Sequence, residues 1–478
     1  MLGSMQDGNR VFRRRGVATR ISAGILALGV VRVLVAFFEH SPALPKADFN
    51  TRFNEVLCLR LGVDPDAVFR NCTRVSGFVS LADVWDRPPP WGQRLPSFGD
   101  LPLPEGAAEA EGERSGVESR MTVHVYPPWS YAFLLPFAHL PRDAAWLLFL
   151  GLQLVALAGA FACGTAGVRH AAGGGAERRT AALLFVGLAL NLGKPWQALF
   201  AYGNYGGIVA GAIAGMVWCL DRRRDAVAGL FLAVAMVKPQ LGLPLCIPLL
   251  LAGRRTTVFV GAAVCMAAGC VPSLLCGIPP WTLFREAFAG GDAFFSGTSF
   301  LPAAVFRAVP ALLPFKKVAL LGCMAAGAAL CTAASLPLAR AGRRTGALEL
   351  LSPAILLSTC WMVSRNYDYV VTVLPLATIV PLLRADGRGG WRRAAFLCAV
   401  TGLFFRNLNP VAGPKVARLT AWILGETGVD LSPVFALRTA AAEALYSVQS
   451  WFVAAAAVLL PGELAARDRA RRAQASDA

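Results

Sequence analysis

The residues best suited to chemistry lie in five short polar segments, each next to an apolar run. The first is Ala47-Asp48-Phe49-Asn50, shortly after the first apolar run. A carboxylate such as Asp48 at a membrane surface can act as a general base that deprotonates a hydroxyl nucleophile. Taken by itself, the same position also fits an ordinary solvated aspartate, so the sequence leaves both interpretations open.

Two further segments combine aromatic residues, prolines and glycines with hydrogen-bonding side chains. In His124-Val125-Tyr126-Pro127-Pro128-Trp129, an imidazole and a phenol stand beside prolines that fix the backbone. The alternative is an interfacial anchor, because Tyr and Trp favour the headgroup level. Tyr202-Gly203-Asn204-Tyr205-Gly206-Gly207 offers an amide that can donate and accept, where glycines allow close backbone approach. The alternative there is a glycine-rich turn.

Cations that could bind phosphate occur in the last two segments. Met236-Val237-Lys238-Pro239-Gln240 lies between two short apolar runs. Its lysine can extend to the membrane interface, or it can pair with a phosphate as a point charge. Ser364-Arg365-Asn366-Tyr367-Asp368-Tyr369 holds an arginine that can bind phosphate in a bidentate manner or pair with Asp368.

The elements that must position these residues are membrane helices. Of 478 residues, 56% are hydrophobic and 16% are charged, and the mean hydropathy is +0.53. A soluble chain has about 45–50% apolar and about 25% charged residues, so a soluble enzyme, a coiled coil and a disordered chain are excluded. The net charge of +17 comes from clusters between apolar runs. This pattern follows the positive-inside rule and does not indicate a nucleic-acid partner.

The basic clusters can all be placed on the cytoplasmic side together, which predicts an all-α polytopic membrane protein. About twelve helices (a range of roughly 10–13) of about 20 residues each would span the ~30 Å hydrocarbon core. Tyr126–Leu140 is short and proline-rich, so it is predicted to be re-entrant or interfacial. The predicted segments are a cytoplasmic N-terminus (1–20), a first membrane helix (21–38), an extracytoplasmic loop (39–128), a multi-helix membrane core (129–405), a second extracytoplasmic loop (406–442), a last membrane helix (443–462) and a cytoplasmic tail (463–478).

Cysteines and the common nucleotide and metal motifs contribute little. The chain has 12 cysteines, most of them in apolar runs, and neither C-x-x-C nor another metal-ligand spacing is present. Cys58 and Cys72 lie in the polar loop, where they form either a disulfide or two unlinked thiols. No Walker A loop, no G-x-G-x-x-G after a strand and no Ser-His-Asp arrangement is visible. We therefore expect no cofactor and no metal ion.

Taken in order, the polar segments give the chain a family resemblance over roughly residues 20–385. The chain resembles glycosyltransferase family 87 of the membrane-embedded GT-C superfamily, which includes mycobacterial mannosyltransferases and arabinofuranosyltransferases. The motifs that carry the resemblance are Asp48-Phe49, Gly62-Val63-Asp64-Pro65, Tyr126-Pro127-Pro128 up to Leu140-Pro141, Gly203-Asn204-Tyr205-Gly206, and Lys238-Pro239 before Arg254-Arg255.

Three features depart from the family pattern. Asn204 replaces the usual glutamine, and no histidine lies near Tyr367 or Asp368. The first loop also carries an acidic, proline-rich insertion between about Gly77 and Ser119. These departures concern the identity of the substrate more than the type of reaction.

The resemblance implies an integral membrane enzyme of the cell envelope. Such an enzyme transfers a mannose- or pentose-type sugar from a polyprenyl-phosphate donor to a glycan or glycolipid acceptor, with inversion. By the same resemblance, Asp48 deprotonates the acceptor hydroxyl, and Lys238 and Arg365 bind the donor phosphate. The residues implied to line the sugar and acceptor pocket are His124, Tyr126, Asn204, Gln240 and Asp368. The implied location is the bacterial cytoplasmic membrane, among its lipids, with the active site on the extracytoplasmic side.

Three other classes are weighed against this one. A transporter or flippase for a lipid-linked or anionic substrate explains the helices and cations equally well, but not the large first loop or Asp48. An enzyme similar to O-antigen ligases or polymerases is disfavoured, because those enzymes place their large functional loop late in the chain. A non-catalytic scaffold is disfavoured because many polar residues gather on one predicted side.

Overall fold

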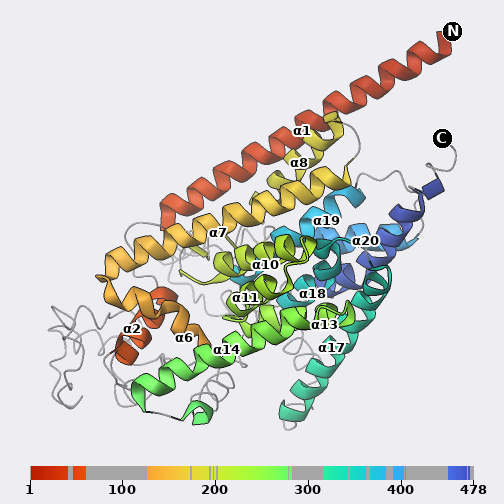
Figure 1. The fold of residues 1–478 in the computed structure, drawn as a ribbon. Helices are drawn as coiled ribbons and strands as arrows, with labels where there is room; N and C mark the ends of the chain where they lie inside the picture. The colour runs from red at the N-terminus through yellow and green to blue at the C-terminus, as the bar shows by residue number, and fades with distance from the viewer. Residues whose placement is uncertain are drawn as a thin grey trace, which may run out of the picture.

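The computed structural model describes the helical parts of the chain, whose arrangement is drawn in Figure 1. The described residues are 2–40, 47–60, 126–172, 175–192, 195–196, 199–200, 203–277, 279–282, 316–342, 345–361, 366–383, 391–402, 404, 451–470 and 472–473. Every regular element among these residues is a helix, which confirms the all-α prediction for this part of the chain.

Long α-helices alternate with short α and 3-10 segments. The first half contains α1 (Leu2–His40), α2 (Ala47–Arg60), α6 (Trp129–Leu134), η2 (Leu135–His139), α7 (Arg142–Ala171), α8 (Gly175–Leu190), α10 (Gly206–Asp221) and α11 (Asp225–Ala235). The second half contains α12 (Pro239–Gly242), η3 (Leu243–Leu245), α13 (Cys246–Leu251), α14 (Arg255–Cys276), α17 (Lys316–Arg340), α18 (Ala347–Trp361), η6 (Asn366–Thr372), α19 (Val373–Leu383) and α20 (Trp391–Gly402). A further helix covers residues 451–470.

Four of the described helices are long and apolar enough to cross a membrane. Their apolar spans are Val17–Val35, Arg142–Ala171, Arg255–Leu275 and Leu321–Arg340. Large apolar side chains on these helices face outward, as contact with lipid requires: Leu147, Phe259 and Leu274 are 65%, 74% and 82% exposed. The chain is thus an all-α membrane protein, while the predicted total number of spanning helices stays a prediction.

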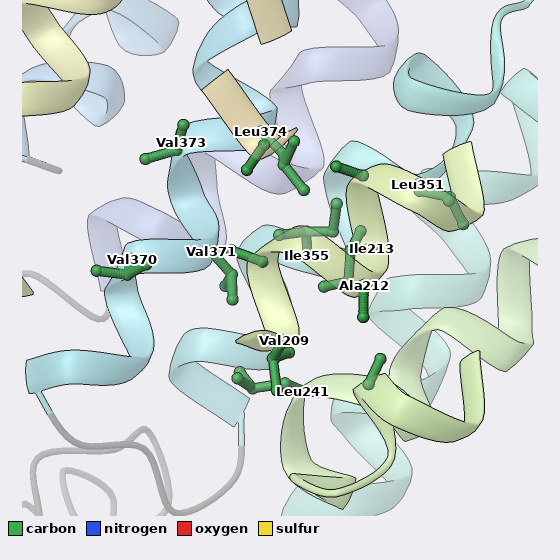
Figure 2. Packing of buried hydrophobic residues seen from close by; sticks show 14 of the residues in the cluster. Val209, Ala212, Ile213, Leu241, Leu351, Ile355, Val370, Val371, Val373 and Leu374 are labelled. Carbon is green, nitrogen blue, oxygen red and sulfur yellow. The ribbon is translucent and has the colours of Figure 1, made fainter. Parts of the chain in front are cut away.

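Helix α10 lies at the centre of the bundle. It packs against α7, α11, α18, α19 and η6, and its residues are buried on nearly all sides, as is typical of an internal helix. Figure 2 shows Val209 and Ile213 of α10 packed together with Leu241, Ile355 and Val371. These contacts fix the start of α10 relative to α12 and η6.

Helices α7 and α10 approach each other closely because small residues line their contact. A Cβ atom at Gly211 would lie only 2.5 Å from the Cβ atom of Ala156, and one at Gly207 only 2.4 Å from Oε1 of Gln153. Small residues spaced four apart let two membrane helices come this near. The approach brings the Gln153 side chain to the start of α10.

The predicted extracytoplasmic loop at 39–128 begins with a packed helix, α2. Phe49, Phe53 and Val56 recur at helical spacing and are buried, which gives this otherwise polar segment an apolar face. That face packs against α6, η2 and α14. Residues 61–125, which include the acidic insertion and Cys72, lie outside the described residues. The predicted alternatives for Cys58 and Cys72, a disulfide or two unlinked thiols, therefore stay open.

The proline-rich segment Tyr126–Leu140, predicted to be re-entrant or interfacial, contains the two short helices α6 and η2. Helix α6 ends after six residues, and Pro136 lies at the start of η2, where its missing N–H costs no helical hydrogen bond. Nε1 of Trp129 donates a hydrogen bond to the carbonyl oxygen of Met236 at 2.7 Å. This bond ties the segment to the end of α11, close in sequence to Lys238.

Candidate active site

Lys238 lies at a break in an apolar helical run. Pro239 is the first residue of α12, and the Lys238 backbone is extended, with φ −114° and ψ 90°. A residue before proline is driven away from the α-helical region, so the Lys-Pro pair itself interrupts the run. The break leaves Lys238 between α11 and α12, in the interior of the bundle.

The Lys238 ammonium forms an ion pair with the Asp368 carboxylate, which η6 contributes. The two side chains are only 1% and 2% exposed. Two charges removed from water are tolerated when they pair, so each side chain depends on the other for its place in the interior. The structure thus joins two predicted site residues. Arg365, which the sequence also offered as a partner for Asp368, lies outside the described residues, so that alternative stays a prediction.

Asn204 and Tyr126, predicted from separate segments, also meet directly. Nδ2 of Asn204 donates a hydrogen bond to the Tyr126 hydroxyl at 3.0 Å, and Asn204 is fully buried. Gly203 before it has φ +66°, a conformation that a glycine adopts without strain. A Cβ at Gly203 would also lie 2.7 Å from the Trp146 ring. The predicted glycine-rich turn therefore positions the Asn204 amide.

Gln153 of α7 fixes the same turn from the other side. Its amide nitrogen donates a hydrogen bond to the backbone carbonyl oxygen of Asn204. Its Oε1 accepts a hydrogen bond from the Ile208 backbone N–H at 2.9 Å, at the first turn of α10. The Gln153 side chain thus provides a partner for a backbone N–H at the start of α10 and for a backbone carbonyl oxygen of the turn. Gln153 is 2% exposed. Sequence reasoning missed Gln153; a glutamine within the apolar run of α7 is the signal that could have identified it.

A buried arginine on α2 is the second residue that sequence reasoning missed. Nη1 of Arg52 donates a hydrogen bond to Oε1 of Glu55 at 2.7 Å, and both side chains are buried. The Arg52 guanidinium also lies 4.7 Å from the centre of the Tyr126 ring, a cation–π distance. The signal in the sequence was a charged pair three positions apart on the face that carries Phe49 and Phe53.

The electrostatic surroundings keep Arg52 charged. Burial acts to lower the pKa of its guanidinium. The Glu55 carboxylate, Tyr131, Tyr126 and Tyr205 act in the opposite direction and outweigh burial, so the pKa of Arg52 is raised above its ordinary value. A permanent positive charge therefore faces the Tyr126 ring.

An aromatic cluster connects α2, α7 and the turn before α10. The ring of Phe49 lies 5.2 Å from the rings of both Trp146 and Phe149. The Tyr205 ring lies 5.6 Å from that of Phe149 and 5.2 Å from that of Tyr126, edge to face in both cases. Such contacts hold α2 rigidly against the bundle.

Asp48 lies within the first turn of α2, directly before Phe49 and one helical turn before Arg52. The packed Phe49 therefore fixes the backbone of the predicted base at this end of the bundle. Gln240 lies in α12 and is half-buried, two positions after Lys238. His124 lies outside the described residues.

These groups belong to one end of the bundle, where α2 packs on α6 and where α10 packs on η6. The end combines a buried cation–carboxylate pair, a second buried guanidinium, and amide and phenol groups that donate and accept hydrogen bonds. Such groups suit a substrate that carries hydroxyls and a negative charge. Among the described residues, no group of three or more His, Cys, Asp or Glu side chains could hold a metal ion.

Comparison with protein families decides the class. The model of glycosyltransferase family 87 matches residues 124–365, from His124 to Arg365 and through Tyr126, Asn204 and Lys238. The chain belongs to glycosyltransferase family 87. It is therefore a membrane glycosyltransferase, as the resemblance of its motifs predicted, and the transporter alternative loses its support. Neither the curated proteins nor the solved structures contain a match to this family 87 enzyme. Asp48, Arg52 and Asp368 lie outside the matched residues.

Proposed function

We propose that this family 87 glycosyltransferase transfers a mannose- or pentose-type sugar from a polyprenyl-phosphate donor to a hydroxyl of a glycan or glycolipid acceptor. The reaction takes place at the α2 end of the bundle, on the extracytoplasmic side of the bacterial cytoplasmic membrane. The anomeric configuration is inverted, because the acceptor oxygen attacks the anomeric carbon from the face opposite the departing phosphate oxygen.

One observation carries this proposal: candidate residues that are far apart in the chain come together in two pairs at one end. Asn204 bonds Tyr126 across 78 positions, and Lys238 bonds Asp368 across 130 positions. The Trp129–Met236 hydrogen bond links the segments that carry the two pairs. The backbone of Asp48 lies on α2, which packs on α6 of the same end.

The proposed step is a single displacement. The Asp48 carboxylate takes the proton of the acceptor hydroxyl, whose oxygen attacks the anomeric carbon of the donor. The bond from this carbon to the phosphate oxygen breaks, and the leaving group departs as polyprenyl phosphate. Negative charge grows on the phosphate during the displacement, so cations placed nearby stabilise the transition state. Lys238 and Arg365 are the proposed cations.

The Lys238–Asp368 pair gives that assignment a specific form. A phosphate that reaches Lys238 competes with Asp368 for the same ammonium, and the resulting charge-assisted hydrogen bond is stronger than a neutral one. Because both side chains are buried, the donor must displace part of the α12 and η6 packing to make this contact. We infer that Asp368 holds the lysine in place before the donor arrives.

The decisive experiment is a transfer assay with the purified protein in nanodiscs. A panel of radiolabelled polyprenyl-phosphate sugars serves as donors, with envelope extract as the source of acceptors. The unsubstituted protein should release polyprenyl phosphate and form labelled product. Asp48→Asn removes the base, and loss of general-base catalysis typically lowers a rate by about 10²–10⁴-fold.

A matched control is Asp143→Asn at the start of α7. Its side chain is 89% exposed and forms a long contact of 3.5 Å with Arg142, so we expect unchanged transfer. Full turnover by Asp48→Asn would remove the assignment of the base. Absence of turnover by the unsubstituted protein with every donor would remove the polyprenyl-phosphate donor from the proposal.

A further inference from the structure

A cavity of about 610 Å³ lies at the opposite end of the bundle from the candidate active site. Residues of α7, α10, α18, α19 and the helix at 451–470 line it. Its size is within the range of about 300–1,000 Å³ that is typical of small-ligand sites. The proposed transfer reaction does not use this cavity.

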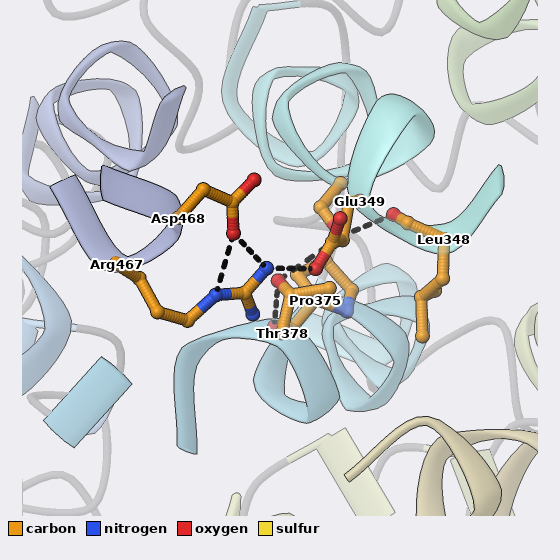
Figure 3. Close-up of polar contacts among 7 residues, drawn as sticks. Leu348, Glu349, Pro375, Thr378, Arg467 and Asp468 are labelled. Atoms are coloured by element: carbon orange, nitrogen blue, oxygen red, sulfur yellow. Dashed lines mark hydrogen bonds and ion pairs between the residues drawn. The ribbon is translucent and has the colours of Figure 1, made fainter. Parts of the chain in front are cut away.

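Arg467 is a buried, hydrogen-bonded side chain in the wall of the cavity. Nη2 of its guanidinium donates to Oε1 of Glu349 at 2.6 Å and to Oδ1 of Asp468 at 3.1 Å, contacts that Figure 3 shows. The Arg467 side chain is only 10% exposed. Its Nη1 is buried and has no hydrogen-bond partner among the residues that the structure describes. A buried guanidinium nitrogen without an acceptor is costly, so this nitrogen calls for one from a bound molecule.

A second guanidinium in the wall is also held in a fixed place. The Arg222 guanidinium lies 4.1 Å from the centre of the Trp218 ring. Its Nη1 also lies 3.3 Å from the Trp218 backbone carbonyl oxygen. Trp218 itself is 47% exposed, and tryptophan is enriched where a membrane meets water. The cavity therefore has an aromatic edge of the kind found at the level of lipid headgroups.

The charges in the wall define the chemistry of the ligand. Two guanidinium groups (Arg222 and Arg467) and the His170 imidazole share the wall with three carboxylates (Asp221, Glu349 and Asp468). A ligand with negative charge alone would meet more carboxylates than guanidinium groups and would be repelled. A ligand with cationic charge alone would leave Nη1 of Arg467 without an acceptor. Only a ligand that carries both a negative and a positive charge can pair with the guanidinium groups and with the carboxylates.

We propose that this cavity binds the phosphoethanolamine headgroup of a membrane phospholipid. The phosphate accepts hydrogen bonds from Arg467 and Arg222, and the primary ammonium donates to the carboxylates. The lipid is favoured over the free compound as the source because Trp218 marks the edge of the cavity as an interfacial surface. The site is separate from the site of sugar transfer and does not depend on the proposed donor or acceptor.

The test compares three headgroups that differ in one property each. The purified protein is placed in nanodiscs of phosphatidylethanolamine, phosphatidylcholine or phosphatidylglycerol, and both thermal unfolding and co-purified lipid are measured, the latter by native mass spectrometry. Phosphatidylcholine has a cation without N–H donors, and phosphatidylglycerol has no cation. We expect phosphatidylethanolamine to be retained about tenfold or more over the other two, since charge-assisted hydrogen bonds distinguish it.

Two variants place this preference in the cavity. Arg467→Gln removes the orphaned donor. Gly346→Trp is designed to fill the space instead and keeps both members of each ion pair, since Gly346 lines the cavity and a Cβ there meets nothing within 4 Å. Both variants should lose the preference. Arg340→Gln, which removes an exposed cation of α17 outside the cavity lining, should keep it.

The two sources of the headgroup are separated in detergent without lipid. Free O-phosphoethanolamine that raises the unfolding temperature as much as the lipid does would assign the site to the free compound. Stabilisation by phosphatidylethanolamine alone would support the lipid. Equal retention of the three lipids, or a preference that survives in Gly346→Trp, would overturn the proposal. If Arg467→Gln fails to fold, Gly346→Trp still decides the question.

Discussion

At the scale of single residues, the candidate site consists of polar groups that the interior accepts only in pairs. Lys238 and Asp368 were both recognisable from their neighbours in the sequence, but their pairing was not. The sequence offered Arg365, which is near Asp368 in the chain, as its partner, and nothing in the local spacing pointed to Lys238. A contact across 130 positions is set by how α10, α12, α18 and η6 pack, which no local pattern specifies.

The Lys238–Asp368 pair leads to a prediction that separates its structural role from its role in transfer. Asp368→Asn leaves the buried ammonium without its carboxylate and should lower the free energy of unfolding by about 3–5 kcal/mol. The double variant Lys238→Met with Asp368→Leu buries no charge and should recover most of that loss, yet transfer no sugar. Thermal unfolding in detergent and the transfer assay give the two readouts.

A part-exposed pair provides the comparison for that prediction. Asp225 and Arg254, with side chains 28% and 33% exposed, form an ion pair of 3.0 Å. Asp225→Asn should cost only about 0–1 kcal/mol, as is usual for pairs near solvent, and should leave transfer unchanged. Normal transfer by the double variant would show that the buried pair serves stability alone.

At the scale of elements, the sequence predicted the apolar helices well and α2, the helix that carries the proposed base, poorly. The polar composition of the stretch at 39–128 indicated a loop, although Phe49, Phe53 and Val56 recur at helical spacing within it. The polar composition of the long stretch indicated a loop, whereas the apolar periodicity of a short part of it indicated a helix. The helix forms because this part packs against α6 and α14. The same packing buries Arg52 and Glu55, which explains why residues that look like surface charges belong to the site.

The close contact of α7 and α10 gives a prediction at this scale. Gly211→Leu forces a side chain against Ala156, where even a Cβ would lie 2.6 Å from backbone atoms. Overpacking of this kind typically costs about 1–3 kcal/mol. Because the two helices must separate, Gln153 should also lose its hold on Asn204, and transfer should fall with stability.

Gly159 is the matched control, because it is an exposed residue of α7 at which an added Cβ would meet no atom within 4 Å. Gly159→Leu should leave unfolding temperature and transfer as they are. Equal losses in both variants would mean that glycine itself, and not the α7–α10 contact, is what these positions require.

At the scale of the whole molecule, the bundle has two chemically distinct ends. One end carries the candidate active site. The other end gathers basic residues around the 610 Å³ cavity, which Arg222 and Arg467 line, and around a second cavity of about 360 Å³, which Arg223 and Arg254 line. Sequence reasoning could place these basic clusters on one side because the positive-inside rule needs only their order along the chain. Sequence reasoning could not find the cavity that Arg467 lines, because the wall of that cavity comes from five elements that are distant in sequence.

This polarity predicts how the enzyme is oriented in its membrane. The positive-inside rule predicts that the turn between α10 and α11 is cytoplasmic and that the start of α7 is extracytoplasmic. Arg223 and Asp143 are exposed at these two places, so Arg223→Cys and Asp143→Cys report on opposite sides. In intact cells, a membrane-impermeant maleimide should label Asp143→Cys strongly and Arg223→Cys only after permeabilisation, relative to the unsubstituted chain. The reverse pattern would place the α2 end in the cytoplasm, where an acceptor of the outer envelope could not reach Asp48.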